Sequence, residues 1–176
     1  MSAVKQPMPK SLLTRWMKSP IGVIEIGVNA NDENGNESLW YIELIDKEQR
    51  KNRHNDDNHP LLDLVQSELD CYFKGESFNF DALLEFQSSY GTKFQKQVWR
   101  ALTKIPLGET WSYGQLANFI NNPKAVRAVG AANGKNPLAI VVPCHRVIGA
   151  NGTLTGYAGG LDNKQKLLDF EKSLVT

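Results

Sequence analysis

Two stretches near the start of the chain have the residue pattern of β-strands. Residues 21–28 (IGVIEIGV) and 38–45 (SLWYIELI) are rich in branched and aromatic side chains, and residues 29–36 between them are mostly polar. Branched and aromatic residues pack well on a pleated sheet, whereas Asn, Asp and Gly favour turns. The pattern therefore predicts a hairpin of a small sheet, with a long polar turn.

The hydrophobic period changes to that of a helix after Pro60. Leucine, valine and aromatic residues recur on one helical face from Leu61 to Phe73, and Lys74-Gly75 is a typical helix end. We expect this amphipathic helix to cover the sheet. Residues 78–86 then form a loose apolar connection, and the turn-rich residues 87–91 predict a boundary between an N-terminal domain, 1–88, and a C-terminal domain, 89–176.

Three successive helices are predicted in the first part of the C-terminal domain. Thr92 and Gln95 have capping-box spacing, so one helix begins at Lys93 and ends near residues 106–108. A second begins at residues 112–115 (SYGQ) and is broken at residues 121–122. Pro123, which suits a first helical turn, begins a third that runs to residue 133. A helix, a short turn and a helix are the outline of a helix-turn-helix.

Most side chains of the third helix are very small. Its alanines and glycine leave only two long side chains, which are cations: Ala125, Ala128, Gly130, Ala131 and Ala132 beside Lys124 and Arg127. Small residues permit close packing of two helices, and they also permit close approach to a nucleic-acid groove. The residue pattern of this helix alone leaves both interpretations open.

Composition and charge narrow the class of protein. The 176 residues carry 41% hydrophobic residues and no apolar run near eighteen residues, and the first ten residues lack the apolar core of a signal peptide. We therefore expect a cytoplasmic protein without a membrane segment. The net charge is +1, yet residues 91–150 carry +7 and the remainder −6. A basic half indicates a nucleic-acid surface or, less specifically, a solvated basic face.

The two cysteines and the histidines suggest little metal chemistry. Two cysteines are too few for a disulfide scaffold, and Cys71 lies in a helical pattern that predicts a core or half-buried thiol. His54, His59, Asp56 and Asp57 occur in the charged loop 47–59, but their spacing fits no tight ligand set and no thiol accompanies them. We expect a solvated loop and no metal.

The other cysteine stands in a context that favours reactivity. Residues 138–142 (LAIVV) read as a buried strand, and Pro143 then makes the chain turn at Cys144. His145 and Arg146 follow, and positive charge near a thiol favours the reactive thiolate. Such a thiol could serve a protease, an amidotransferase, a redox sensor or an alkyl acceptor. The residues alone do not choose among these.

A family resemblance rests on a longer pattern. Pro143-Cys144-His145-Arg146-Val147, preceded by Asn136-Pro137 and followed by residues 156–160 (GYAGG), resembles the O6-alkylguanine-DNA alkyltransferases. The resemblance is close over residues 91–171 and general before them. It implies an α/β (α+β) fold, in which a small N-terminal sheet-plus-helix domain precedes a mainly helical domain with a winged helix-turn-helix-like motif.

The resemblance also implies an activity and a partner. The expected reaction is DNA repair by irreversible, single-turnover transfer of an alkyl group from O6-alkylguanine, with O4-alkylthymine as a further candidate. The acceptor is Cys144 and the partner is double-stranded DNA bound through its minor groove, with the damaged nucleotide flipped out. Arg127 would fill the space that this nucleotide leaves. Further residues expected at the DNA are Lys124, Ala125, Ala128, Gly130 and Lys135. We expect a monomer in solution, with clustering on DNA left open.

The resemblance assigns a role to each residue of the active site. His145, through a water molecule, would take the proton of Cys144, and Glu171 would orient the imidazole. Asn136 would tie the turn together and help to set the histidine or the thiol, and Tyr113 would donate its phenol proton to the leaving guanine. The backbone of Val147 and Ala158 would bind the base edge, Tyr157 would form an apolar wall, and Gly159 would permit close approach.

No cofactor is expected, and the chain looks like the stand-alone bacterial form. It lacks the additional cysteines that human-type relatives use for zinc. Two other functions remain open. One is a non-catalytic module that binds alkylated DNA and recruits other repair factors, although members of that group have lost the cysteine. The other is a thiol hydrolase unconnected with DNA.

Overall fold

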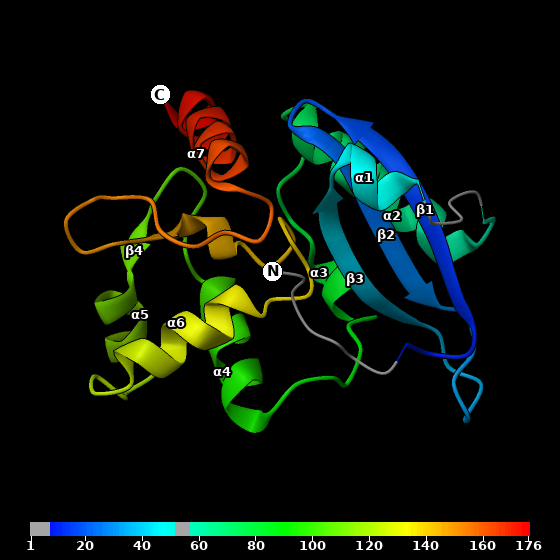
Figure 1. The fold of residues 1–176 in the computed structure, drawn as a ribbon, viewed down its shortest axis with the longest axis horizontal. Helices are drawn as coiled ribbons and strands as arrows, with labels where there is room; N and C mark the ends of the chain where they lie inside the picture. The colour runs from blue at the N-terminus through cyan, green and yellow to red at the C-terminus, as the bar shows by residue number, and fades with distance from the viewer. Residues whose placement is uncertain (1–7, 52–56) are drawn as a thin grey trace. The chain divides into compact units, whose positions relative to one another are not determined.

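The computed structural model describes residues 8–51 and 57–176 of the chain. It divides into two compact units, one of which ends at Ser89 while the other begins at Tyr90. The first unit holds a three-stranded sheet with helices, and the second holds helices and one short pair of strands (Figure 1). The expected mixed α/β fold class is therefore confirmed. The support role of residues 1–88 stays a prediction.

Three antiparallel strands form the sheet of the first unit in the order β1-β2-β3. They are β1 (Leu12–Ser19), β2 (Gly22–Asn29) and β3 (Ser38–Ile45). The predicted hairpin is confirmed by the pairing of β2 with β3. The sequence analysis missed β1, because seven of its eight residues are half-buried or exposed and it lacks the continuous apolar run of β2.

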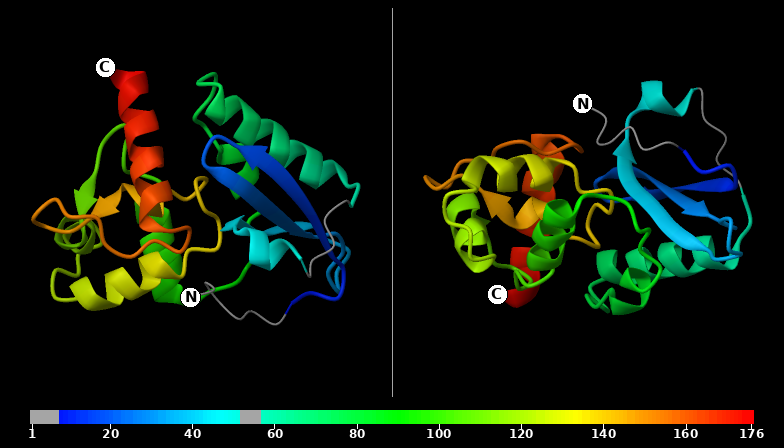
Figure 2. Two further views of the ribbon diagram at one scale, coloured as in Figure 1. Left: turned by 45° about the horizontal axis from the view of Figure 1, so that its top comes forward. Right: turned by 90° about the horizontal axis from the view of Figure 1, so that it is seen from below.

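Helix α2 (Pro60–Phe73) covers the sheet, as predicted. Leu62, Val65 and Leu69 are fully buried, and the helix contacts β1 and β2 (Figures 1 and 2). It ends at the C-cap Lys74, and Gly75 follows in the left-handed conformation with φ of 75°. A glycine adopts this conformation without the Cβ clash that other residues suffer.

Two segments expected to be irregular each contain one turn of helix. They are α1 (Lys47–Arg50) in the charged loop and α3 (Asp81–Leu84) in the apolar connection. Helix α1 has a capping box, since the Asp46 carboxylate accepts from the backbone N–H of Gln49 and the Gln49 side chain accepts from that of Asp46. Residues 52–56 of the charged loop, with His54 and Asp56, lie outside the described residues.

The second unit begins with α4 (Lys93–Leu102). The predicted capping box of Thr92 and Gln95 is present, and the Trp99 indole N–H donates to the carbonyl oxygen of Ala132 over 2.8 Å. This buried bond ties α4 to the later helix that contains Ala132. The predicted end near residues 106–108 was too late, because the helix stops at Leu102 and the following residues form turns.

Helices α5 (Tyr113–Phe119) and α6 (Val126–Gly134) pack together as the predicted helix-turn-helix. The predicted start of α6 at Pro123 was wrong. The backbone N–H of Ala125 donates to the carbonyl of Asn122, so Pro123 occupies the second position of a β-turn that its fixed φ suits equally well. Lys124 and Ala125 therefore precede the helix instead of lying within it.

The remaining elements are short until the last helix. Strands β4 (Trp111–Ser112) and β5 (Val147–Ile148) pair in parallel, and the single-turn 3-10 helix η1 (Cys144–Arg146) directly precedes β5. Helix α7 (Leu161–Val175) has Gly160 as its N-cap. Asp162 and Asn163, whose residue types would suit a helix cap in the sequence, instead lie inside the first turn. No helix in the described ranges is long and apolar enough to cross a membrane.

Candidate active site

The residues before the cysteine do not form the predicted strand. Residues 138–142 make tight turns in which the Val142 N–H donates to the Leu138 carbonyl, and Ile140 has a φ of 73°. The Asn136 amide holds these turns: its Nδ2 donates to the Val142 carbonyl over 2.7 Å, and its Oδ1 accepts from the Leu138 N–H over 3.0 Å. Residues 138–142 are largely buried, as they would be in a strand. The side chain of Asn136 bonds to their backbone, however, where a neighbouring strand would do so in a sheet.

Cys144 is held at the start of η1 and is only 7% exposed. Burial raises the pKa of its thiol, because the low-dielectric interior disfavours the anion. Hydrogen bonding from Asn136 and the positive charge of Lys164 oppose this shift in the pKa. The resting group is therefore a shielded thiol that needs a base to become nucleophilic.

The residue that follows the cysteine is a buried histidine paired with a carboxylate. His145 Nε2 is 2.8 Å from Glu171 Oε1, and both side chains are fully buried. Burial opposes ionisation of Glu171, but hydrogen bonds from His145 and Arg146 and the charge of Arg146 outweigh it and hold the pKa of Glu171 at about 2. The carboxylate is thus an acceptor, and Nε2 must carry the proton of the neutral ring. Burial also lowers the pKa of His145, which favours that neutral form.

The tautomer leaves Nδ1 of His145 as an unprotonated nitrogen. In the part of the chain that the structure describes, this buried atom has no hydrogen-bond partner. A neutral imidazole whose N–H is bound by a carboxylate presents its lone pair at the other nitrogen. The arrangement can therefore accept a proton at Nδ1.

Arg146 serves the carboxylate and not the thiol, contrary to our expectation. Its Nε and Nη2 donate to the two oxygens of Glu171 over 2.7 and 2.8 Å, and its Nη1 donates to the Ile105 carbonyl over 2.7 Å. A guanidinium matches a carboxylate in this two-point geometry, so the pair is strongly oriented. Arg146 keeps Glu171 ionised and fixed in place.

The cation that does act on the thiol is Lys164, which the sequence analysis missed. Its fully buried ammonium donates to the carbonyls of Val147 over 2.6 Å and Thr155 over 2.8 Å. Its charge lowers the pKa of Cys144. A signal was available, because Lys164, Leu167 and Glu171 have the spacing of one helical face, where a lysine at a core position is unusual.

Tyr113 lies at the N-terminal end of α5 and reaches the glycine-rich loop. Its hydroxyl donates to the Thr155 carbonyl over 3.5 Å and accepts from the Thr155 hydroxyl over 3.2 Å. A Cβ built on Gly130 of α6 would lie 3.7 Å from the tyrosine ring. Tyr113 therefore joins the helix-turn-helix to the loop that follows the cysteine.

The other residues expected to bind the base lie in or next to the same loop. Val147 follows η1, and its carbonyl accepts from Lys164. Tyr157 is half-buried, its hydroxyl has no partner among the described residues, and burial raises its pKa well above the usual range. Ala158 is exposed, and Gly159 accepts through its carbonyl from the side chain of Asn163 over 2.8 Å.

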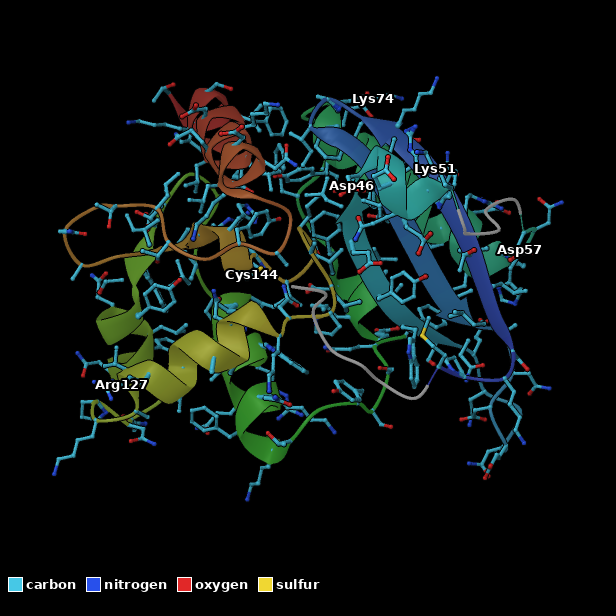
Figure 3. The ribbon with its side chains drawn as sticks, in the orientation of Figure 1. Asp46, Lys51, Asp57, Lys74, Arg127 and Cys144 are labelled. Carbon is cyan, nitrogen blue, oxygen red and sulfur yellow. The ribbon has the colours of Figure 1, made fainter. Side chains whose placement is uncertain are left out.

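The residues expected at DNA gather on and next to α6. Arg127, at the N-terminal end of the helix, is exposed (Figure 3). Ala128 and Lys135 are exposed as well. Lys124 is exposed in the preceding turn, and Ala125 and Gly130 are half-buried. These residues belong to the same unit as Cys144, and Gly130 lies next to the ring of Tyr113.

The histidine and aspartate of the charged loop that the structure describes have local roles. His59 caps α2 through Nδ1, which accepts from the Leu61 N–H, and its Nε2 is 3.6 Å from Glu37. Asp57 accepts from the backbone N–H of Thr14 over 2.8 Å. Outside residues 1–7 and 52–56, no group of three or more potential metal-ligating side chains occurs.

Comparison with known proteins gives a consistent picture. Residues 93–173 match the family model "6-O-methylguanine DNA methyltransferase, DNA binding domain". A methylated-DNA–protein-cysteine methyltransferase from Methanosarcina mazei is 49% identical over 160 residues, covering 89% of this chain and 95% of the relative. One from Mycolicibacterium paratuberculosis is 45% identical over 159 residues, covering 90% and 91%.

Solved structures agree with these sequences. The O6-methylguanine methyltransferase of Mycobacterium tuberculosis superposes with a TM-score of 0.76 at 41% identity, covering 92% of this chain and 93% of that one. The M. tuberculosis OGT in complex with DNA gives a TM-score of 0.75 at 42% identity, with the same coverage. The chain therefore belongs to the methylated-DNA–protein-cysteine methyltransferase family, whose members are the O6-alkylguanine-DNA alkyltransferases.

Proposed function

We propose that this protein repairs DNA by moving a methyl or other alkyl group from O6 of guanine in a duplex to the sulfur of Cys144. The observation that carries the proposal is the buried pair of His145 and Glu171, bonded through Nε2, which leaves Nδ1 free to act as a base. A buried thiol next to such a base is the arrangement of an activated nucleophile. Membership of the family supplies the substrate class.

The chemical step is a displacement at carbon. Nδ1 of His145, through a water molecule, takes the proton of Cys144 while the sulfur attacks the alkyl carbon. The bond between sulfur and carbon forms, the bond between carbon and O6 breaks, and its electron pair passes to the guanine. Tyr113 donates its phenol proton to a ring nitrogen of that base, and the proton held by His145 replaces it through solvent.

The product makes the protein a single-use reagent. A thioether at Cys144 has no ionisable proton, and freeing the sulfur again would require a thiolate to leave from an unactivated alkyl carbon, so we propose that each molecule reacts once. Lys164 contributes by favouring the thiolate, and Asn136 contributes by fixing the turn that carries it. Arg146 acts indirectly, because it fixes the carboxylate of Glu171, which in turn orients His145.

The substrate base must leave the duplex to react. Cys144 is 7% exposed, so a base stacked in a helix cannot present its alkyl group to the sulfur. We propose that α6 enters the minor groove with its small residues, Ala128 and Gly130, near the DNA, and that Arg127 fills the vacated space in the stack. Lys124 and Lys135, both exposed, would contact phosphates.

The flipped base would be held by the loop after β5. Its edge would meet the backbone of Val147 and Ala158, Gly159 would permit close approach, and Tyr157 would cover one face. The Val147 carbonyl already accepts from Lys164, and a carbonyl oxygen has a second lone pair to offer. We further propose a cytoplasmic monomer, in which both cysteines, free in this structure, stay reduced.

The test is intact-protein mass after incubation with a duplex that contains one O6-methylguanine. We expect one methyl in place of the thiol hydrogen, located by peptide mapping at Cys144 and abolished by Cys144→Ser. The matched control is Cys71→Ser, which removes the other cysteine and should leave the transfer intact. Binding of the duplex without any gain in mass would refute the proposal.

A further inference from the structure

Thr155 makes two different contacts with the phenol of Tyr113. Its hydroxyl donates to the Tyr113 oxygen over 3.2 Å, and its carbonyl accepts from the same hydroxyl group over 3.5 Å. Both are longer than the usual O–H···O distance of about 2.5–3.0 Å, and the contact from the threonine hydroxyl is the shorter of the two. The hydroxyl of Thr155 is thus closer to the phenol oxygen than its carbonyl is, and its carbonyl is only a weak acceptor for the phenol proton.

The carbonyl of Thr155 has a second and closer partner in a neighbouring lysine. The Thr155 carbonyl also accepts from the Lys164 ammonium over 2.8 Å. A hydrogen bond from a charged donor is stronger than one from a neutral hydroxyl, so the lysine is the main partner of this carbonyl. The phenol proton is consequently available to another acceptor, while the phenol oxygen remains tethered.

We infer that Thr155 is a positioning residue for Tyr113, and this inference rests on the proposed function. The hydroxyl of Thr155 keeps donating to the phenol oxygen when the phenol turns its proton toward the departing guanine. As that proton moves to the ring nitrogen, negative charge develops on the phenol oxygen. The hydrogen bond from Thr155 strengthens with this charge, so it stabilises the transition state more than the resting state.

The backbone and the hydroxyl of Thr155 can be tested separately. Valine has nearly the shape of threonine without the hydroxyl, and it retains the carbonyl that Lys164 binds. Serine retains the hydroxyl without the methyl group. Thr153 is a matched control in the same loop, because its exposed hydroxyl donates to Asn151 over 2.7 Å and the proposed reaction does not use it.

The experiment measures single-turnover methyl transfer at a saturating concentration of duplex, together with duplex affinity. We expect Thr155→Val to slow transfer by about fivefold, the equivalent of one ordinary hydrogen bond, with unchanged affinity. Thr155→Ser should restore most of the rate, and Thr153→Val should leave it unchanged. In a Tyr113→Phe background, Thr155→Val should have no further effect, because the group on which it acts is gone.

The outcomes separate this inference from the proposed function. If the wild-type protein gains no methyl group at Cys144, the proposed function is refuted. If the wild-type protein is methylated at Cys144 but Thr155→Val transfers the methyl group at the wild-type rate, only the positioning role of Thr155 is refuted. It also fails if Thr155→Val slows transfer equally with and without the Tyr113 hydroxyl, since the threonine would then act only by shaping the loop.

Discussion

The substitution Glu171→Gln tests the central ion cluster most directly. Glu171 is fully buried and accepts three hydrogen bonds, one from His145 and two from Arg146. All three partners are donors, so an amide in place of the carboxylate must turn its own NH₂ group toward a donor. Glutamine has the same size, and the change therefore removes charge and acceptor capacity without creating a cavity.

The size of the effect follows from the pKa of Glu171. That pKa is lowered from the ordinary value of 4.5 to about 2. At 1.36 kcal/mol per pH unit, ionised Glu171 contributes about 3 kcal/mol to the free energy of unfolding at pH 7. Loss of one partner from a buried ion pair usually costs about 3–5 kcal/mol, which agrees. We expect Glu171→Gln to lower the free energy of unfolding by about 3 kcal/mol and to slow methyl transfer, because His145 loses its orienting acceptor.

Acid should reduce the difference in stability between the wild-type protein and the Glu171→Gln variant. A carboxylate with a depressed pKa stabilises the fold fully above its unfolded-state pKa, here 4.5, and the contribution disappears as the pH falls through about 2. The difference in unfolding free energy between the wild-type protein and Glu171→Gln should therefore shrink from about 3 kcal/mol at pH 7 to about 1 kcal/mol near pH 3. Urea unfolding followed by circular dichroism at both pH values measures it.

The matched control is Glu109→Gln. Glu109 is exposed in the same unit, so the identical chemical change should alter stability by less than about 0.5 kcal/mol. A Glu171→Gln protein within 1 kcal/mol of the unmodified one at pH 7, or a gap that stays constant in acid, would refute the reasoning.

Three further predictions concern neighbouring groups. Burial raises the pKa of Cys144, so the rate at which iodoacetamide alkylates this thiol should still increase above pH 9. Peptide mass spectrometry measures this rate, and a plateau below pH 8 would contradict the prediction. Burial lowers the pKa of His145 from 6.5, so the rate of methyl transfer should stay level from pH 8 to 6.5 and fall only in stronger acid, and an earlier decline would contradict it. Asn136→Ala should lower the free energy of unfolding by about 2–4 kcal/mol, because the N–H of Leu138 and the carbonyl of Val142 lose their buried partner. Urea unfolding measures this change, and a loss of less than about 1 kcal/mol would contradict the prediction.

Features that depend on a few adjacent residues were predictable from the sequence. The capping box of Thr92 and Gln95, the hairpin of β2 and β3, and the end of α2 at Lys74 all have local causes, namely side-chain reach, alternation of side chains, and glycine's freedom at positive φ. The motif around Cys144 similarly identified the family, because a family pattern is itself a property of the sequence.

Features that depend on distant partners were not predictable in the same way. Residues 138–142 are apolar enough for a strand, but the Asn136 side chain satisfies their backbone, and no rule of periodicity anticipates this. Pro123 suits a helix start and a β-turn equally, and the bond from Ala125 to Asn122 decided for the turn.

The sequence by itself determined the family and the order of most elements, and it singled out Cys144 as the candidate nucleophile. Only the tertiary structure decided which charges act on which groups. Arg146, next to the cysteine in sequence, pairs with Glu171, while Lys164, twenty residues away, acts on the thiol. The physical reason is that electrostatic interactions depend on distance and burial in space, and these are set by how α7 packs against η1.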